Sequence, residues 1–212
     1  MKVIIAGGNG LIGSALVKAF RKRGSEVVCA DINGSGEYFN MKYPETLEMI
    51  FDRHRPIDAF VNCVYPKDWE TAFKGWCDCT VLVANELSEN GGSIVNFGSI
   101  YGMVGPDTRI HKDCEMVKPT VEYAFIKGGI INATKFIAVE YAKCGVRCNV
   151  ISPGGVFDNQ PDQFVKRYTE KCPMGRMAIP EDIIEAVWFL INQGSEYVSG
   201  CNIPIDGGWT AW

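Results

Sequence analysis

Short apolar runs alternate along the chain with longer segments that have the pattern of amphipathic helices. The apolar runs cover residues 2–6, 26–31, 58–63, 93–97, 146–151 and 201–205. The helical pattern covers residues 11–23, 44–54, 69–89, 120–143, 162–171 and 180–192. Apolar strands that are each preceded by a helix-length segment are typical of a parallel sheet covered by helices on both faces. The pattern therefore predicts an α/β fold with a doubly wound, mostly parallel sheet.

Nothing in the sequence divides this series into parts. No linker, internal repeat or low-complexity stretch interrupts it, so we expect one domain over residues 1–212. A hydrophobic share of 47% with 22% charged residues is typical of a packed globule and excludes a disordered chain. The first apolar run is too short for a signal sequence, and no run approaches the ~20 residues of a membrane span. We expect a cytoplasmic protein that does not insert into a membrane.

Charge and cysteine content exclude several other classes. The net charge of −4 gives no basic surface for nucleic acid or anionic lipid, so neither is an expected partner. Nine cysteines occur without any Cys-x-x-Cys pair and beside only two histidines, which favours reduced, mostly buried thiols and no metal site. The same shortage of histidine leaves few candidates for the base of a Ser-His-Asp hydrolase.

A glycine turn joins the first apolar run to the first helix. Gly7, Gly10 and Gly13 have the spacing of the fingerprint that lets a backbone approach a pyrophosphate at a helix N-terminus. A dinucleotide cofactor is therefore expected at this turn. The predicted contacts are Gly7, Asn9, Gly10, Leu11, Ile12 and Gly13.

An acidic residue ends the second apolar run, about 20 residues after the turn, where the fingerprint places one. The carboxylate of Asp31 can accept hydrogen bonds from both hydroxyls of the adenosine ribose, and it would repel a 2′-phosphate. No Arg or Lys lies in the glycine turn or directly after Asp31 to neutralise such a phosphate. This favours NAD over NADP, with Ile32 as a neighbouring contact. The alternative is that Asp31 only caps the turn that follows it.

Four further motifs, VNFGSIYG, YAFIK, CNVISPGGV and IPIDGGW, give the chain a family resemblance. Together with the glycine turn, they resemble the short-chain dehydrogenase/reductase family over nearly the whole chain. Ser99, Tyr123 and Lys127 match the catalytic serine and the Tyr-x-x-x-Lys pair of that family. The resemblance implies that Tyr123 is the acid/base, that Lys127 lowers its pKa and contacts the nicotinamide ribose, and that Ser99 holds the substrate oxygen.

The Tyr-x-x-x-Lys spacing alone is weak evidence, although it puts both side chains on one helix face. Tyr38 and Lys42 form a second copy, but they follow the second strand, at the adenine end of the expected cofactor site. Tyr123 comes after Ser99 and near the start of a long helix, which favours it. The alternative for Tyr123 is a core or interface tyrosine.

Other positions match the family less evenly. Pro153 and Gly154 match the turn beneath the nicotinamide, and Val156 would then offer backbone contacts to the carboxamide. Asn62 matches the start of the family's Asn-Asn-Ala-Gly motif, whereas Cys63, Val64 and Tyr65 replace the rest. The resemblance adds the following cofactor contacts: Asn40 and Met41 at the adenine, Asn62, Cys63 and Val64 along the motif, and Tyr123 and Lys127 at the nicotinamide ribose. The family's catalytic Asn is absent, and Trp76 or a neighbour holds its place.

Two segments depart from the family in length. Residues 32–39 are too few for a helical crossover between parallel strands, so one peripheral helix is expected to be missing. Residues 100–122 exceed the family's usual gap, and this insert is expected to overhang the substrate side. Its Arg109, His111 and Lys112 are candidates for contacts with an anionic or polyhydroxylated substrate. The alternative is a solvated surface loop.

The resemblance implies an NAD-dependent oxidoreductase that interconverts a secondary alcohol and a carbonyl. The insert and the GGWTAW ending are similar to members placed in bacterial surface-sugar and flagellin-glycan pathways, which favours a small, polar, sugar-derived substrate. Homo-oligomerisation as a dimer or tetramer through helices 69–89 and 120–143 is expected by the same resemblance. Two alternatives stay open: the extended branch that acts on nucleotide sugars, and a dinucleotide-binding sensor or scaffold protein with weak or lost catalysis.

Overall fold

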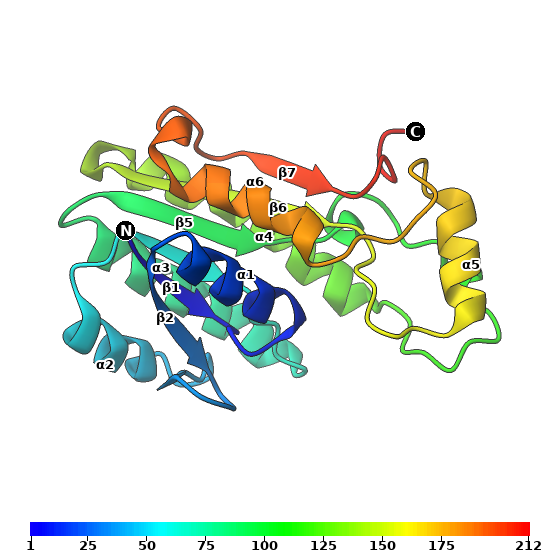
Figure 1. Ribbon diagram of the computed structural model, residues 1–212, viewed down its shortest axis with the longest axis horizontal. Coiled ribbons are helices and arrows are strands. Elements are labelled where there is room, and N and C mark those ends of the chain that lie inside the picture. The colour runs from blue at the N-terminus through cyan, green and yellow to red at the C-terminus, as the bar shows by residue number, and fades with distance from the viewer.

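Seven strands form one parallel sheet in the order β3-β2-β1-β4-β5-β6-β7 in the computed structural model, which describes residues 1–212 (Figure 1). The strands are β1 (Lys2–Ala6), β2 (Glu26–Asp31), β3 (Glu37–Tyr38), β4 (Ala59–Asn62), β5 (Gly92–Phe97), β6 (Val146–Pro153) and β7 (Asn202–Ile205). The predicted doubly wound parallel sheet is confirmed. The strand order reverses between β1 and β4, which is where ligands bind in open α/β sheets.

Helices cover both faces of this sheet. The helices are α1 (Leu11–Lys22), α2 (Glu45–His54), α3 (Trp76–Leu87), α4 (Val121–Glu140), α5 (Asp162–Lys171) and α6 (Glu181–Ile191). One core cluster joins the sheet to α2, α3 and α4, and a second joins it to α1 and α6. In Figure 1, α1 and α6 lie in front of the sheet and α3 and α4 behind it. The helix predicted at 69–89 is divided, because a π-helical turn (Thr71–Gly75) precedes α3.

Local sequence explains why α1 forms where it does. Its inward face buries Leu16, Val17 and Phe20 at helical spacing. Basic residues occupy its last turn, and Gly24 follows with a φ of +82°, a conformation that favours glycine and ends helices. The helix therefore begins directly after the glycine turn, and its N-terminus points to the carboxyl edge of the sheet.

The connection after β2 confirms the missing helix. β2 and the two-residue β3 are parallel neighbours, with Ala30 opposite Glu37 and Asp31 opposite Tyr38, and only a short loop joins them. No helix connects these two strands, as the length of the segment predicted. The strand β3 itself was not predicted, because two residues are too few to show an alternating pattern.

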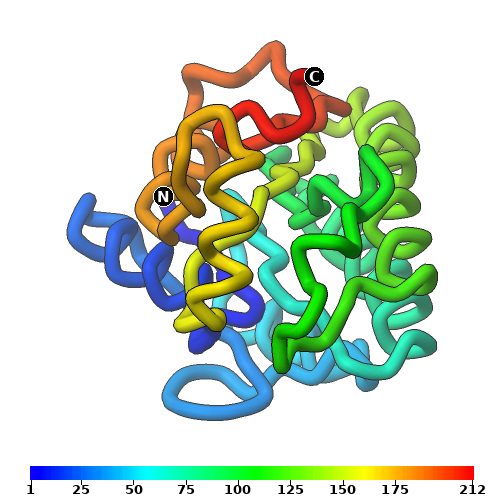
Figure 2. The backbone as a smooth tube through the Cα atoms, turned by 90° about the vertical axis from the view of Figure 1, so that its right-hand side faces the viewer, coloured from blue at the N-terminus to red at the C-terminus, as the bar shows by residue number.

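A third, smaller core lies beyond the carboxyl ends of the strands. It joins the segment after β5, with its short 3₁₀ turns Ile100–Gly102 and Thr108–His111, to α5 and to Trp209 near the C-terminus. Figure 2 shows this segment, in green, and α5, in yellow, on the side of the molecule where the strands end. None of the helices is long and apolar enough to cross a membrane.

Candidate active site

A cavity of about 560 Å³ lies at the carboxyl ends of β1, β2 and β4, where the strand order reverses. Eight of the predicted cofactor contacts line it: Gly7, Gly10, Asp31, Ile32, Asn40, Met41, Cys63 and Val64. Further lining residues were not predicted: Phe39, Lys42, Tyr65, Pro66, Lys67, Asp68 and Thr71. The structure therefore brings together segments that follow three different strands around one space.

Two glycines of the turn, Gly7 and Gly13, have no room for a side chain. Gly7 has a φ of +76°, and a Cβ on Gly13 would lie 2.1 Å from the carbonyl oxygen of Gly7. Gly10 caps α1, whose first turn has no acidic residue, so the free N–H groups of that turn favour an anion. Asn9, Leu11, Ile12 and Gly13 belong to the turn and the first turn of the helix but do not line the cavity.

The carboxylate of Asp31 faces this turn and also lines the cavity. Its Oδ2 accepts a hydrogen bond from the Asn9 N–H at 2.9 Å, and its Oδ1 accepts one from the Asn33 N–H at 3.2 Å. Asp31 therefore caps the following turn, as the alternative reading held. Each carboxylate oxygen can accept another hydrogen bond, so the cap leaves the carboxylate free to accept ribose hydroxyls.

Two predicted cofactor contacts, Asn40 on the cavity wall and Asn62 outside it, differ in how far their polar groups are engaged. The Asn40 side chain accepts from the Lys42 N–H at 3.0 Å and donates to Tyr38 Oη at 3.3 Å. Asn62 is buried at the end of β4, where its Oδ1 accepts from the Val64 N–H and its Nδ2 has no partner. A buried donor without a partner costs free energy, so an acceptor from a bound group at this position would stabilise it.

Ser99 and Tyr123 line a second cavity, of about 670 Å³, beside the first. Ser99 follows β5 and caps a 3₁₀ turn, and Thr120 caps α4 by accepting the Tyr123 N–H at 3.2 Å. Burial raises the pKa of the Tyr123 phenol, and a hydrogen bond with Ser99 opposes that rise. The two caps thus fix both side chains against one space.

Lys127 lies one helical turn after Tyr123 and behind the cavity wall rather than on it. Its Nζ is buried and donates to the carbonyl oxygen of Phe97 at 2.8 Å. Burial lowers the pKa of Lys127 to about 8, and the nearby Cys63 opposes that change. Its ammonium lies 4.8 Å from the centre of the Tyr65 ring and 5.8 Å from that of Tyr123, within cation–π range.

Tyr65 is a site residue that sequence reasoning passed over. Its ring lines both cavities and meets the Tyr123 ring edge-on, with 5.1 Å between the ring centres. In the sequence, Tyr65 departs from the family's Asn-Asn-Ala-Gly motif, and that departure alone does not predict a place in the site. A bulky aromatic where the motif has glycine was the available signal. Tyr38 of the second Tyr-x-x-x-Lys copy lines neither cavity.

The insert after Ser99 overhangs the second cavity, as predicted, but only one of its three candidate substrate contacts lies on the cavity wall. His111 lines the cavity, whereas Arg109 and Lys112 do not. The Arg109 side chain is 88% exposed and pairs with Asp107, which also pairs with Lys171 at 2.8 Å. These two cations hold the pKa of Asp107 well below its usual range. Neither Arg109 nor Lys112 is therefore placed to contact a substrate.

The turn after β6 also contributes to the wall of the second cavity. Gly154 lines the second cavity directly after Pro153, which ends β6. The Gly155 N–H donates to Tyr168 Oη at 2.6 Å, and Val156 forms a parallel bridge with Ala178. Pro153 and Val156 do not line the cavity. They lie on either side of the turn that carries Gly154.

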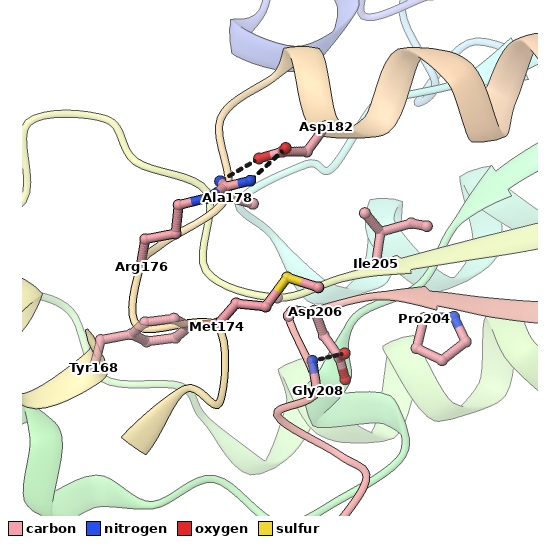
Figure 3. Close-up of a pocket in the computed structure, with 11 residues that line it drawn as sticks. Tyr168, Met174, Arg176, Ala178, Asp182, Pro204, Ile205, Asp206 and Gly208 are labelled. Atoms are coloured by element: carbon pink, nitrogen blue, oxygen red, sulfur yellow. Dashed lines mark hydrogen bonds and ion pairs between the residues drawn. The ribbon is translucent and has the colours of Figure 1, made fainter. Parts of the chain in front are cut away.

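A third cavity, of about 410 Å³, lies between this turn and the segment after β7 (Figure 3). Its charged side chains satisfy one another or the backbone. Arg176 forms two hydrogen bonds with Asp182, at 2.6 and 2.8 Å. Asp206 accepts from the Gly208 N–H and from both the N–H and the hydroxyl of Thr210. No group of three or more His, Cys, Asp or Glu side chains is arranged to hold a metal ion anywhere in the structure.

Comparison with known proteins identifies the family. The sequence profile described as "Enoyl-(Acyl carrier protein) reductase" matches residues 45–210. A crystal structure of a short-chain dehydrogenase from Leptospira borgpetersenii with bound NAD⁺ superimposes with a TM-score of 0.87 at 32% identity, covering 99% of this chain and 92% of that one. The chain belongs to the short-chain dehydrogenase/reductase family. As a member, it is an oxidoreductase of the class that acts on CH–OH groups.

Two further relatives of this short-chain dehydrogenase/reductase are similar in sequence. A flagellin modification protein from Campylobacter coli is 27% identical, over 98% of this chain and 97% of its own length. The human (3R)-3-hydroxyacyl-CoA dehydrogenase is 32% identical, over 71% of this chain and 58% of its own length. The family resemblance inferred from the motifs is therefore confirmed.

Proposed function

We propose that the protein interconverts a secondary alcohol and a carbonyl, with NAD as the hydride carrier and Tyr123 as the acid/base. One observation carries this proposal: Ser99 and Tyr123 line one cavity, and Lys127 Nζ lies 5.8 Å from the centre of the Tyr123 ring. The glycine-turn cavity is adjacent, since Tyr65 and Lys67 line both. Substrate and cofactor sites would thus meet at the phenol.

The residues of the first cavity fit NAD. The glycine turn and the start of α1 would hold the pyrophosphate, and Asp31 would accept the hydroxyls of the adenosine ribose. Asn62 Nδ2, at the end of β4, is a buried donor without a partner. The similar protein from Leptospira borgpetersenii binds NAD⁺, which supports the same choice. When bound, NAD would accept or donate a hydride at its nicotinamide ring.

The chain's own residues would move the proton and hold the substrate. Ser99 would donate a hydrogen bond to the substrate oxygen, and Tyr123 would take the proton from the alcohol or return it to the carbonyl. A phenol titrates near 10, and burial raises the pKa of Tyr123 further in the free protein. Positive charge beside the phenol must therefore favour the phenolate. The Lys127 ammonium is such a charge, held by Phe97.

The substrate is proposed to be small, polar and derived from a sugar. The relative from Campylobacter coli is named for flagellin modification, and Lys67, Ser99, His111 and Lys118 give the second cavity polar groups for such a compound. A panel of sugar alcohols, hydroxy acids and simple secondary alcohols, each with NAD⁺, tests this by the absorbance of NADH. We expect at least one polar member to be oxidised faster than the simple alcohols. Oxidation of apolar alcohols alone would reject the proposed substrate class.

A homo-oligomer is proposed to form through α3 and α4. Large apolar side chains are exposed on these helices and the segment before α3: Trp69, Phe73, Val81, Val121, Phe125, Phe136 and Val139. Exposed apolar patches of this kind mark protein interfaces. We expect light scattering to give a dimer or tetramer and Phe136→Lys to give a smaller species. Met49→Lys, an exposed apolar position on α2, is the control that should leave the mass unchanged. A monomeric wild-type protein at micromolar concentration would refute this proposal.

A further inference from the structure

The wall of the second cavity is cationic and aromatic and contains no carboxylate. Beside Ser99 and Tyr123, it is lined by the cationic or titratable side chains of Lys67, His111 and Lys118 and by aromatic side chains such as Phe164. Two lysines and a histidine thus surround a space that the proposed reaction uses only at Ser99 and Tyr123. Because the whole chain is acidic, with a net charge of −4, this local excess of positive charge is not a consequence of composition.

His111 has a polar atom that nothing in the protein satisfies. The residue is only 3% exposed, and its Nδ1 forms no hydrogen bond. Its ring packs on Phe164 with 5.0 Å between the ring centres, which fixes its orientation. Burial lowers the pKa of His111, and the charge of Lys118 lowers it further, while the backbone and charge of Asp107 oppose the change. A group bound in the cavity could supply the missing hydrogen bond.

The two lysines of the cavity are also free. No ion pair of the structure includes Lys67 or Lys118. Asp107, the carboxylate of the insert whose charge acts on His111, is itself paired with Arg109 and Lys171. In the third cavity, by contrast, Arg176 and Asp182 neutralise each other (Figure 3). The ionisable side chains on the wall of the second cavity that form no ion pair, Lys67 and Lys118, are thus both cationic.

We propose that the substrate carries an anionic group, a carboxylate or a phosphate, which binds between Lys118 and His111 while its carbinol carbon lies at Ser99 and Tyr123. Lys67 adds positive charge on the opposite loop, after β4. Lysine and a histidine N–H form charge-assisted hydrogen bonds with such oxygens. The proposal rests on the proposed oxidoreductase function, because it names the substrate class of that site.

Matched substrate pairs test the proposal and separate its two anion sources. The carboxylate arm compares 3-hydroxybutyrate with 2-butanol, and the phosphate arm compares glycerol 3-phosphate with glycerol, each with NAD⁺. We expect the anionic member of at least one pair to have a kcat/KM at least about tenfold higher, and Lys118→Ala to remove that advantage. Arg109→Ala, in the same insert but outside the cavity, should change kcat/KM less than twofold. Equal rates for both members of each pair, or an unchanged preference in Lys118→Ala, would overturn the proposal and leave the oxidoreductase function standing.

A binding measurement decides the matter if no member of either pair is turned over. The chain has only two histidines, so histidine-labelled protein with NADH bound gives a simple NMR spectrum. Titration with inorganic phosphate and with acetate should shift the His111 signals in at least one case, and Lys118→Ala should weaken that binding about tenfold. His54, whose Nε2 lies 2.8 Å from Glu37 Oε1, is the internal control and should not move. Absence of a specific His111 shift with either anion would overturn the proposal, whereas failure to bind NADH would instead reject the proposed function.

Discussion

Replacing Tyr123 by phenylalanine is expected to lower kcat about a thousandfold and to leave NADH affinity within about twofold. The substitution removes only the hydroxyl that would carry the proton. The ring would remain against Tyr65 and in front of Lys127, so the packing of the cavity wall should persist. Steady-state kinetics on whichever alcohol of the panel is oxidised, together with NADH fluorescence, measure both quantities.

The matched control for this substitution lies at the other end of the same helix. Tyr141 follows α4, and its hydroxyl donates to Asn85 Oδ1 at 2.7 Å, outside both cavities. Tyr141→Phe should therefore leave kcat within about twofold. If Tyr123→Phe also retained kcat within about tenfold, another group would be the acid/base and the assignment of Tyr123 would be wrong.

Replacing Asp31 by asparagine is expected to weaken NADH binding about tenfold to a hundredfold and to reduce the preference for NADH over NADPH. The carboxylate would form charge-assisted hydrogen bonds with the ribose, and its charge would repel a 2′-phosphate. Asparagine keeps one acceptor oxygen, so it can retain one of the two hydrogen bonds from the N–H groups of Asn9 and Asn33. Fluorescence titrations of wild type and variant with both nucleotides measure the change.

A second acidic residue on the same strand provides the control. Glu26 begins β2, at the end of the strand away from the cavity, and pairs with Lys2 at an exposed position. Glu26→Gln should leave both dissociation constants within about twofold, since exposed ion pairs contribute little. Unchanged NADH affinity in Asp31→Asn would mean that this carboxylate only caps the turn before Asn33.

The sequence predicted the sheet and its helices well, because each element has a distinct signal. The runs of Val, Ile and Ala in β1 and β4 are buried on both faces, and the glycine turn marks where α1 begins. The missing helix after Asp31 followed from length alone. The π-helical turn Thr71–Gly75 was not predicted, because its sequence continues the helical pattern of α3.

The site was predicted less evenly than the fold. Motifs located Ser99, Tyr123 and Lys127, but they could not assign the charged residues of the insert. Arg109 and Lys118 are both cationic residues of the insert, and the sequence does not show which of them faces the substrate. In the structure, Arg109 pairs with Asp107, whereas Lys118 forms no ion pair and lines the cavity. Tyr65 was missed for a related reason, since a departure from a motif does not say which space the new side chain fills.

The measurement that tests the central claim most directly is a titration of the purified wild-type protein with NADH and with NADPH, followed by nicotinamide fluorescence. It needs no knowledge of the substrate and probes the glycine turn and Asp31 together. We expect NADH to bind in the micromolar range or tighter and NADPH at least about tenfold more weakly. Binding of neither nucleotide would contradict the account, because the glycine turn would then be only structural and the protein would have to act as a scaffold rather than as a dehydrogenase.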